Sequence, residues 1–219
     1  MARYKNGING TFKGKLGNVV GASSRGIDYM RSLPTPTLKA PSEKQLNQRA
    51  LLSMVSSWLK PLKALIWIGY QIFNGEKTPM NQAVAFHLKE AVTGNSAATY
   101  AIDFARAVFS RGELLISLIK QVLALADGIL SIEWENPSAS VFCKDDDRAT
   151  VVVYNPAKQE FVTFQDIALR AEQKVDLQLP ENFSGDVVHT WMHYVNAAGD
   201  AVSTTQYLGE IQIFYQIDL

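Results

Sequence analysis

The feature that most constrains this chain is its glycine-rich N-terminal segment, residues 6–32, which holds six of the 14 glycines. Single apolar or aromatic residues and basic side chains stand between them. Glycine at this density costs backbone entropy and leaves few side chains to bury. The segment can form short paired strands, expected at 10–15, 17–22 and 27–33, but it needs a surface to lie on. The sequence therefore predicts an arm and not an independent domain.

A proline-rich stretch follows the arm. Pro34, Pro36 and Pro41 each lack a backbone N–H donor, and each disfavours helix in the residue before it. These prolines predict an extended linker, so that residues 1–41 form the arm and its connection to the rest of the chain.

Residues 42–98 have the spacing of a small helical body. Ser42 with Gln45 three residues later is a capping box, which predicts that a helix begins here. Apolar residues then recur at three- and four-residue intervals as far as Leu62. Segment 62–73 is apolar nearly all round, so we expect a buried helix there.

A third helix is predicted after Thr78, which is followed by proline at the first helical position. His87 falls on this helix with only Glu90 as a nearby carboxylate, and we expect it to be a surface or partly buried histidine. The predicted buried side of the helix consists of Met80, Val84, Phe86, Leu88 and Ala91.

Residues 99–219 change to a pattern of short strands with a turn signal about every ten residues, which is typical of an antiparallel sandwich. The periodicity of 114–126 fits a helix or a buried strand, and segment 209–219 is expected to be a further edge strand. The fold class is thus α+β: a Gly-rich N-terminal β arm, a small helical body and a C-terminal antiparallel immunoglobulin/fibronectin-like β-sandwich. The other strands are expected at 101–109, 129–134, 149–154, 160–164, 175–179, 187–195 and 201–208.

The net charge of the chain is zero, but the charges are unevenly distributed. Residues 1–49 hold nine Lys/Arg and two Asp/Glu, a net charge of +7, whereas residues 130–219 hold five and fourteen, a net charge of −9. A basic arm and an acidic sandwich favour docking of the arm on a sandwich, within one molecule or between copies. Exchange between copies is a heterologous contact, which gives a ring or an open filament.

Two short motifs resemble catalytic loops but fail on spacing. The sequence GTFKGKLGN from Gly10 has three residues between its glycines where a phosphate-binding loop has four, and Leu16 stands where such a loop has Ser or Thr. GASSRG from Gly21 has one residue too many for a nucleophile elbow. The sequence therefore predicts no catalytic residues and no cofactor site.

Metal sites are disfavoured on similar grounds. His189 and His193 share a face of one expected strand but stand about 13 Å apart, too far for a single ion. The run from Asp145 to Asp147 lacks the alternating ligands of a calcium loop, so we expect a solvated loop. We predict no metal ligands.

The single cysteine, Cys143, excludes an intrachain disulfide and favours a reducing compartment. The N-terminus lacks the apolar run of a secretory signal, and the apolar stretch 62–73 is far shorter than the roughly 20 residues of a membrane span. We expect synthesis in the cytoplasm and no membrane partner.

Several motifs together resemble a family of uncharacterised Bacteroidota proteins of about this length. They are GxxGxFxGKxGNVVG from Gly7, RSLP from Arg31, Gln48-Arg49, Ser110-Arg111-Gly112, VVVYNPAK from Val151 and the closing hairpin. The resemblance spans nearly the whole chain and implies the same architecture, without an activity. The entry to the first helix, QLNQRA, is also similar to segments of some phage structural proteins.

The function predicted from these features is a non-enzymatic structural or assembly subunit that self-associates through its arm. A filament or a virion-like particle, extracellular or phage-like, is one form of such an assembly. The alternative is a nucleic-acid-binding module, because basic and aromatic residues on the arm suit phosphate contacts and base stacking. The predicted interaction residues are Tyr4, Phe12, Lys13, Lys15, Arg25, Tyr29 and Arg31.

Overall fold

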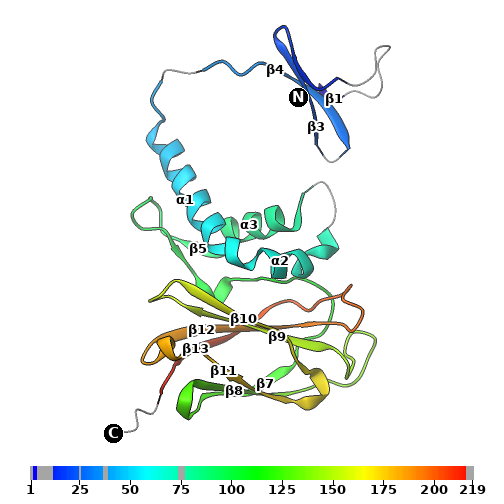
Figure 1. The fold of residues 1–219 in the computed structure, drawn as a ribbon, viewed down its shortest axis with the longest axis vertical. Coiled ribbons are helices and arrows are strands. Elements are labelled where there is room, and N and C mark those ends of the chain that lie inside the picture. The colour runs from blue at the N-terminus through cyan, green and yellow to red at the C-terminus, as the bar shows by residue number, and fades with distance from the viewer. Residues whose placement is uncertain (1, 4–11, 25, 37–38, 74–76, 216–219) are drawn as a thin grey trace. The chain divides into compact units, whose positions relative to one another are not determined.

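The computed structural model describes residues 2–3, 12–24, 26–36, 39–73 and 77–215 of the 219-residue chain. These residues divide into two compact units, Met1–Ser42 and Glu43–Leu219. We call the first unit the N-terminal sheet and the second the body. Figure 1 traces both units along the chain.

The N-terminal sheet is an antiparallel sheet of four short strands in the order β1-β4-β3-β2. The strands are β1 (Ala2–Arg3), β2 (Gly14–Leu16), β3 (Val19–Ser24) and β4 (Ile27–Ser32). The strands predicted at 17–22 and 27–33 are confirmed with small shifts, and that predicted at 10–15 overlaps β2. Gly17 permits the tight turn between β2 and β3 because its φ is +58°. Among the unit's described residues from Phe12 onwards, only Gly21 is buried.

The body begins with the predicted helices. They are α1 (Glu43–Leu59), η1 (Lys60–Leu62), α2 (Lys63–Gly69), η2 (Gln71–Phe73) and α3 (Pro79–Glu90). The predicted cap of α3 is confirmed, because the Thr78 hydroxyl accepts a hydrogen bond of 3.2 Å from the Asn81 N–H. The buried stripe consists of Val55, Leu59, Leu62, Leu65 and Ile66.

The buried helix predicted at 62–73 is confirmed in part, because Leu62, Leu65 and Ile66 are buried but the segment divides into η1, α2 and η2. Trp67, Ile68 and Ile72 are between 38% and 54% exposed. The reason is that the helices pack on the sandwich along one side only. The stretch Glu43–Gly69 is long and apolar enough to cross a membrane, but the core helices of soluble proteins meet the same criteria of length and composition. In the structure this stretch bends at η1, which contains Pro61.

The sandwich contains seven antiparallel strands in two sheets. The large sheet has the order β10-β9-β12-β13 and the small sheet the order β11-β8-β7. Antiparallel sheets of four and three strands packed on each other have the architecture of immunoglobulin- and fibronectin-like sandwiches, so the predicted architecture is confirmed. The strands are β7 (Leu118–Ala124), β8 (Ile129–Glu135), β9 (Arg148–Asn155), β10 (Glu160–Leu169), β11 (Lys174–Gln178), β12 (Val187–Val195) and β13 (Gln206–Gln212), and the single-turn helices between strands are η4 (Ala126–Gly128), η5 (Arg170–Glu172) and η6 (Glu181–Phe183).

The ambiguous segment 114–126 forms a strand, β7, and not a helix. The predicted strand 101–109 is largely wrong. Within this segment only β6 (Ala101–Ile102) is a strand, which pairs with β5 (Val92–Thr93), and the chain then turns into η3 (Phe104–Arg106). The Asp103 carboxylate accepts a hydrogen bond from the Ala105 N–H and thereby caps this turn, which ends the strand.

The closing hairpin also differs from its prediction. Segments 201–208 and 209–219 were expected to be two strands, but β13 runs across their boundary as one strand paired with β12. Gly209 has a φ of +110° and lies at a shift in the register with β12. A glycine at this position permits a bulge within one strand, so it does not end the strand.

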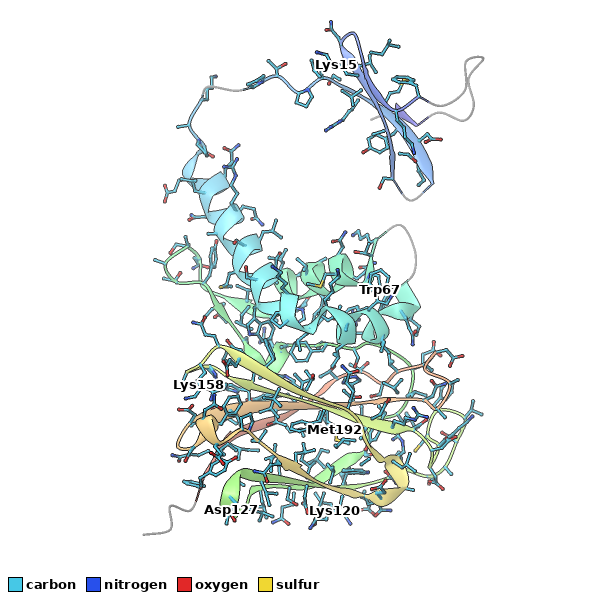
Figure 2. The ribbon with its side chains drawn as sticks, viewed as in Figure 1. Lys15, Trp67, Lys120, Asp127, Lys158 and Met192 are labelled. Carbon is cyan, nitrogen blue, oxygen red and sulfur yellow. The ribbon has the colours of Figure 1, made fainter. Side chains whose placement is uncertain are left out.

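Both faces of the large sheet are buried. Along β12, Val188, Met192 and Tyr194 face the small sheet, whereas Trp191 packs against the helices. Figure 1 shows the resulting three layers, with the helices, the large sheet and the small sheet stacked in that order, and Figure 2 shows Met192 between the two sheets. Segments 42–98 and 99–219, which the sequence separates, therefore share one core within a single compact unit.

Candidate functional site

The register of the N-terminal sheet gathers basic and aromatic residues on one face. Lys15 lies directly opposite Val20, and Val20 lies opposite Arg31. Side chains directly opposite each other share a face, and the next row on this face pairs Ala22 with Tyr29. We call this the basic face. The Lys15 and Arg31 side chains are exposed, and Tyr29 is half-buried.

The other face is mixed, because apolar residues share it with Ser32, opposite Val19, and with Asp28, opposite Ser23. Phe12 lies over Gly21, where an added Cβ would stand 2.7 Å from the Phe12 ring, so only glycine permits this contact. Leu16 lies opposite Val19 on the same face, and both side chains are exposed. Phe12 therefore does not share a face with Lys15.

The predicted interaction residues are thus brought together in part. Lys15, Tyr29 and Arg31 share the basic face, and exposed Lys13 precedes β2. Tyr4 and Arg25 lie outside the described residues. Successive side chains of a strand point to opposite faces, so Phe12 and Lys15, three positions apart, belong to opposite faces of one extended segment. The sequence alone does not show this because it does not give the bounds of the strand.

The body contains a polar cleft of about 230 Å³ between α2 and the large sheet. His193 lines the cleft and is fully buried, and its Nδ1 has no hydrogen-bond partner among the described residues. Burial lowers the pKa of His193 to about 4, so the ring is neutral at pH 7. The Arg148–Asp166 ion pair, 3.6 Å long, lies at the same cleft. A neutral imidazole beside a paired guanidinium provides hydrogen bonds but no activated nucleophile.

A second cleft, of about 370 Å³, is aromatic. Trp58 from α1 lies over Phe161 and Tyr154 of the large sheet, with ring centroids 5.3 and 5.7 Å apart. Burial raises the pKa of Tyr154. These rings also belong to the core between helices and sheet, so their contacts are those of packing.

The other histidines are held by the fold. His87 is fully buried, so the prediction of a surface or partly buried residue is wrong. Its Nδ1 lies 2.8 Å from the Ala83 carbonyl, and its Nε2 accepts a hydrogen bond from the Val108 N–H. His189 Nδ1 lies 2.7 Å from the Tyr207 hydroxyl. Across the described ranges, no group of three His, Cys, Asp or Glu side chains could hold a metal ion.

The acidic run was predicted to be a solvated loop, and this is wrong for one member. Asp145 and Asp146 are exposed, but Asp147 is buried and its Oδ2 lies 3.0 Å from Nε of the buried Arg170. Arg170 also donates to Ser117 Oγ and to the Leu115 carbonyl. Its guanidinium carbon lies 3.7 Å from the centroid of the Tyr194 ring. No spacing in the sequence links residues 147 and 170, so sequence reasoning missed this pair.

The two rejected loop motifs fall within the N-terminal sheet. Lys15 lies in β2, and Ser23 and Ser24 lie in β3. Neither motif therefore joins a strand to a helix, the arrangement that a phosphate-binding loop or a nucleophile elbow needs.

Comparison of the chain with known protein families identifies the family to which it belongs. Residues 11–209 match the family of unknown function DUF6266. The chain belongs to this family. No curated protein matches the chain. The expectation of an uncharacterised family is confirmed, whereas an origin in Bacteroidota stays a prediction. The DUF6266 match covers the β2–β4 part of the N-terminal sheet and the body as far as Gly209, which lies within β13.

Proposed function

We propose that this DUF6266 protein is a non-enzymatic assembly subunit whose copies associate through the N-terminal sheet. The proposal rests on one observation: the sheet has exposed residues on both faces, and from Phe12 onwards Gly21 is the only described residue of the unit that is buried. Three or more strands need a buried hydrophobic face, or packing against another element, to be stable. This sheet therefore requires a partner surface.

The composition of the unit excludes the other usual means of stabilising so small a unit. Compact units below about 40 residues need disulfides, metals or oligomerisation. Residues 1–42 contain no Cys, His or Glu and one Asp, Asp28, so neither a disulfide nor a metal site of these ligands can form within them. The remaining means is docking on a sandwich, of the same chain or of another copy, and we propose that it occurs between copies.

The basic face favours a second candidate, a nucleic-acid-binding module. Lys15 and Arg31 flank Val20, and Tyr29 stands on the next row of the same face. Phosphate contacts from such residues would make binding fall steeply with salt. The sandwich segment with a net charge of −9 supports assembly over nucleic acid, because it would repel a phosphate backbone.

The test is the solution mass of the full-length chain by light scattering, with absorbance at 260 nm recorded alongside. Assembly predicts a mass well above the 24.3 kDa of one chain, with protein absorbance only. Deletion of residues 1–33 is then expected to leave a folded monomer. A full-length monomer free of nucleic acid would overturn the proposal, and nucleic acid released by salt would favour the second candidate.

A further inference from the structure

One end of the sandwich carries an exposed apolar surface bordered by acids. Val141 and Phe142, 78% and 47% exposed, occupy the tip of a tight turn closed by two hydrogen bonds between Ser140 and Cys143. After one exposed cation, Lys144, the loop continues with two carboxylates, Asp145 and Asp146, which are also exposed. We call the following set the acid-bordered patch: Leu115, Ile116, Val141, Phe142, Asp145 and Asp146.

Backbone and side-chain hydrogen bonds join the loops of the patch and hold them to the core. The Leu115 N–H donates to the Phe142 carbonyl at 2.8 Å, and the Leu115 carbonyl accepts from the buried Arg170 guanidinium at 2.8 Å. The Ala171 N–H donates to the Asp145 carbonyl at 3.2 Å. The apolar side chains are therefore exposed on a firm framework, because buried contacts fix the backbone beneath them.

Charge distinguishes this patch from the other exposed apolar surfaces of the body. Trp67, Ile68 and Ile72 lie next to exposed Lys63 on the helical layer. On the small sheet, Lys120 forms an ion pair with Glu135. Figure 2 shows Trp67 and Lys120 on these two layers.

The acids of the patch are not neutralised in this way. Among the described residues, no ion pair is formed by Asp145 or Asp146. The patch thus combines exposed apolar side chains with two adjacent carboxylates open to a basic partner, whereas on the small sheet a single carboxylate, Asp176, shares a row with exposed Leu123.

The basic face of the N-terminal sheet has the complementary arrangement. Val20 and Tyr29 supply apolar surface on neighbouring rows, and Lys15 and Arg31 stand at the two ends of the Val20 row. Figure 2 marks Lys15 on this sheet. Apolar surface bordered by cations can meet apolar surface bordered by carboxylates, which gives both burial and correct alignment of charge.

We propose that the acid-bordered patch is the docking site for the basic face of the N-terminal sheet of a second copy. This inference rests on the proposed function and specifies which surface receives the sheet. The contact is heterologous, because each copy offers a sheet to one neighbour and a patch to another. Repetition of the contact yields a ring or a filament.

The test uses charge reversals in the full-length chain. One variant carries Lys15→Glu and Arg31→Glu, and the other carries Asp145→Lys and Asp146→Lys. Each places like charges across the contact and is expected to raise the concentration at half-association about tenfold or more, since close interfacial charge pairs couple by more than the 1.4 kcal/mol that a tenfold change requires.

Mixing the two variants is the decisive step. In an equimolar mixture, the acidic sheet of one variant meets the lysine patch of the other, and the remaining native sheet meets the native patch. Association is therefore expected to return to near the wild-type level. No return in the mixture would overturn the proposed site.

Matched apolar variants test the centre of the contact. Phe142→Ser is expected to weaken association, whereas Trp67→Ser, at a side chain of similar exposure beside a lysine, should leave it unchanged. If Phe142→Ser and the patch reversal both assemble like wild type while deletion of residues 1–33 gives a monomer, the docking site is wrong and the proposed function stands. A wild-type chain that is monomeric at every concentration overturns both.

Discussion

The N-terminal sheet and the large sheet of the body both contain four antiparallel strands, yet they differ in what covers them. The large sheet packs on the small sheet through one face and on the helices through the other, so that Val151, Val152 and Val153 of β9 are all fully buried. In the N-terminal sheet, Leu16 is 67% exposed and Gly21 alone is buried among the described residues from Phe12 onwards. Strand pairing alone does not make a stable unit, and the covering of the faces decides which unit is self-sufficient.

The largest expected effect removes the buried charge pair of the body. Arg170→Met leaves the Asp147 carboxylate buried without its partner, and the free energy of unfolding should fall by about 3–5 kcal/mol. Urea denaturation followed by fluorescence measures this. The matched control is Arg148→Met, which removes an exposed pair with Asp166 and should cost no more than about 1 kcal/mol. Equal losses in the two variants would show that burial does not determine how much an ion pair contributes to the free energy of unfolding.

A pair of leucine truncations compares the two units directly. Leu59→Ala opens a cavity between the helices and the large sheet and should lower the free energy of unfolding of the body by about 2–5 kcal/mol. Leu16→Ala, on the N-terminal sheet, should change it by less than about 0.5 kcal/mol. The same denaturation experiment measures both. A comparable loss from Leu16→Ala would contradict the distinction between the units.

A fall in pH should lower the stability of the body in particular, because all three histidines of the chain belong to it. The folded-state pKa of His193 is about 4, below the ordinary 6.5, so the unfolded chain binds a proton first as the pH falls. The stability from neutral His193 is complete above pH 6.5 and is lost towards pH 4, on the order of 3 kcal/mol in all and about 2 kcal/mol by pH 5. Denaturation midpoints from pH 7 to pH 5 measure the loss.

The control for this prediction is His193→Gln, which has no titrating ring and should have a flatter stability profile over the same range. Burial also lowers the pKa of His87, so part of the pH dependence should remain in the variant. An unchanged profile would show that His193 is not buried as a neutral ring.

Deletion of the whole N-terminal unit is expected to have little effect on the stability of the body. A chain of residues 43–219 keeps both hydrophobic clusters of the body. Its Tm should therefore lie within about 3 °C of the body transition of the full-length chain, a difference below about 1 kcal/mol. Differential scanning calorimetry measures both. A much lower Tm would mean that the body depends on the N-terminal sheet for its own stability.

The sequence predicted those parts of the fold that have a local signal. The Thr78-Pro79 cap and the alternation along β12 placed α3 and a two-faced strand correctly. Gly209 was taken for a strand boundary because a bulge and a turn both favour glycine, and only the partner strand distinguishes them. The sequence predicted a buried helix at 62–73, but composition does not reveal how many sides of a helix meet a neighbour, and α2 is buried on one side only.

For the candidate site, composition predicted the basic residues of the sheet but not their faces. The alternation of side chains separates Phe12 from Lys15 only once the strand register is known. The acid-bordered patch could not be predicted from the sequence. Its two apolar pairs are 26 residues apart, from Leu115 to Val141, and the hydrogen bonds that join them correspond to no periodic pattern in the sequence. Likewise, the Asp147–Arg170 pair joins two loops across 23 positions.

Hydrogen exchange at the backbone amides of β3 and β4, measured against protein concentration, tests the central claim most directly. Assembly through the N-terminal sheet predicts fast exchange in these strands at concentrations where the chain is monomeric and slow exchange once it associates, while β9 and β12 are protected throughout. Protection of β3 and β4 that is already complete in the dilute monomer would contradict the account, because the sheet would then need no second copy.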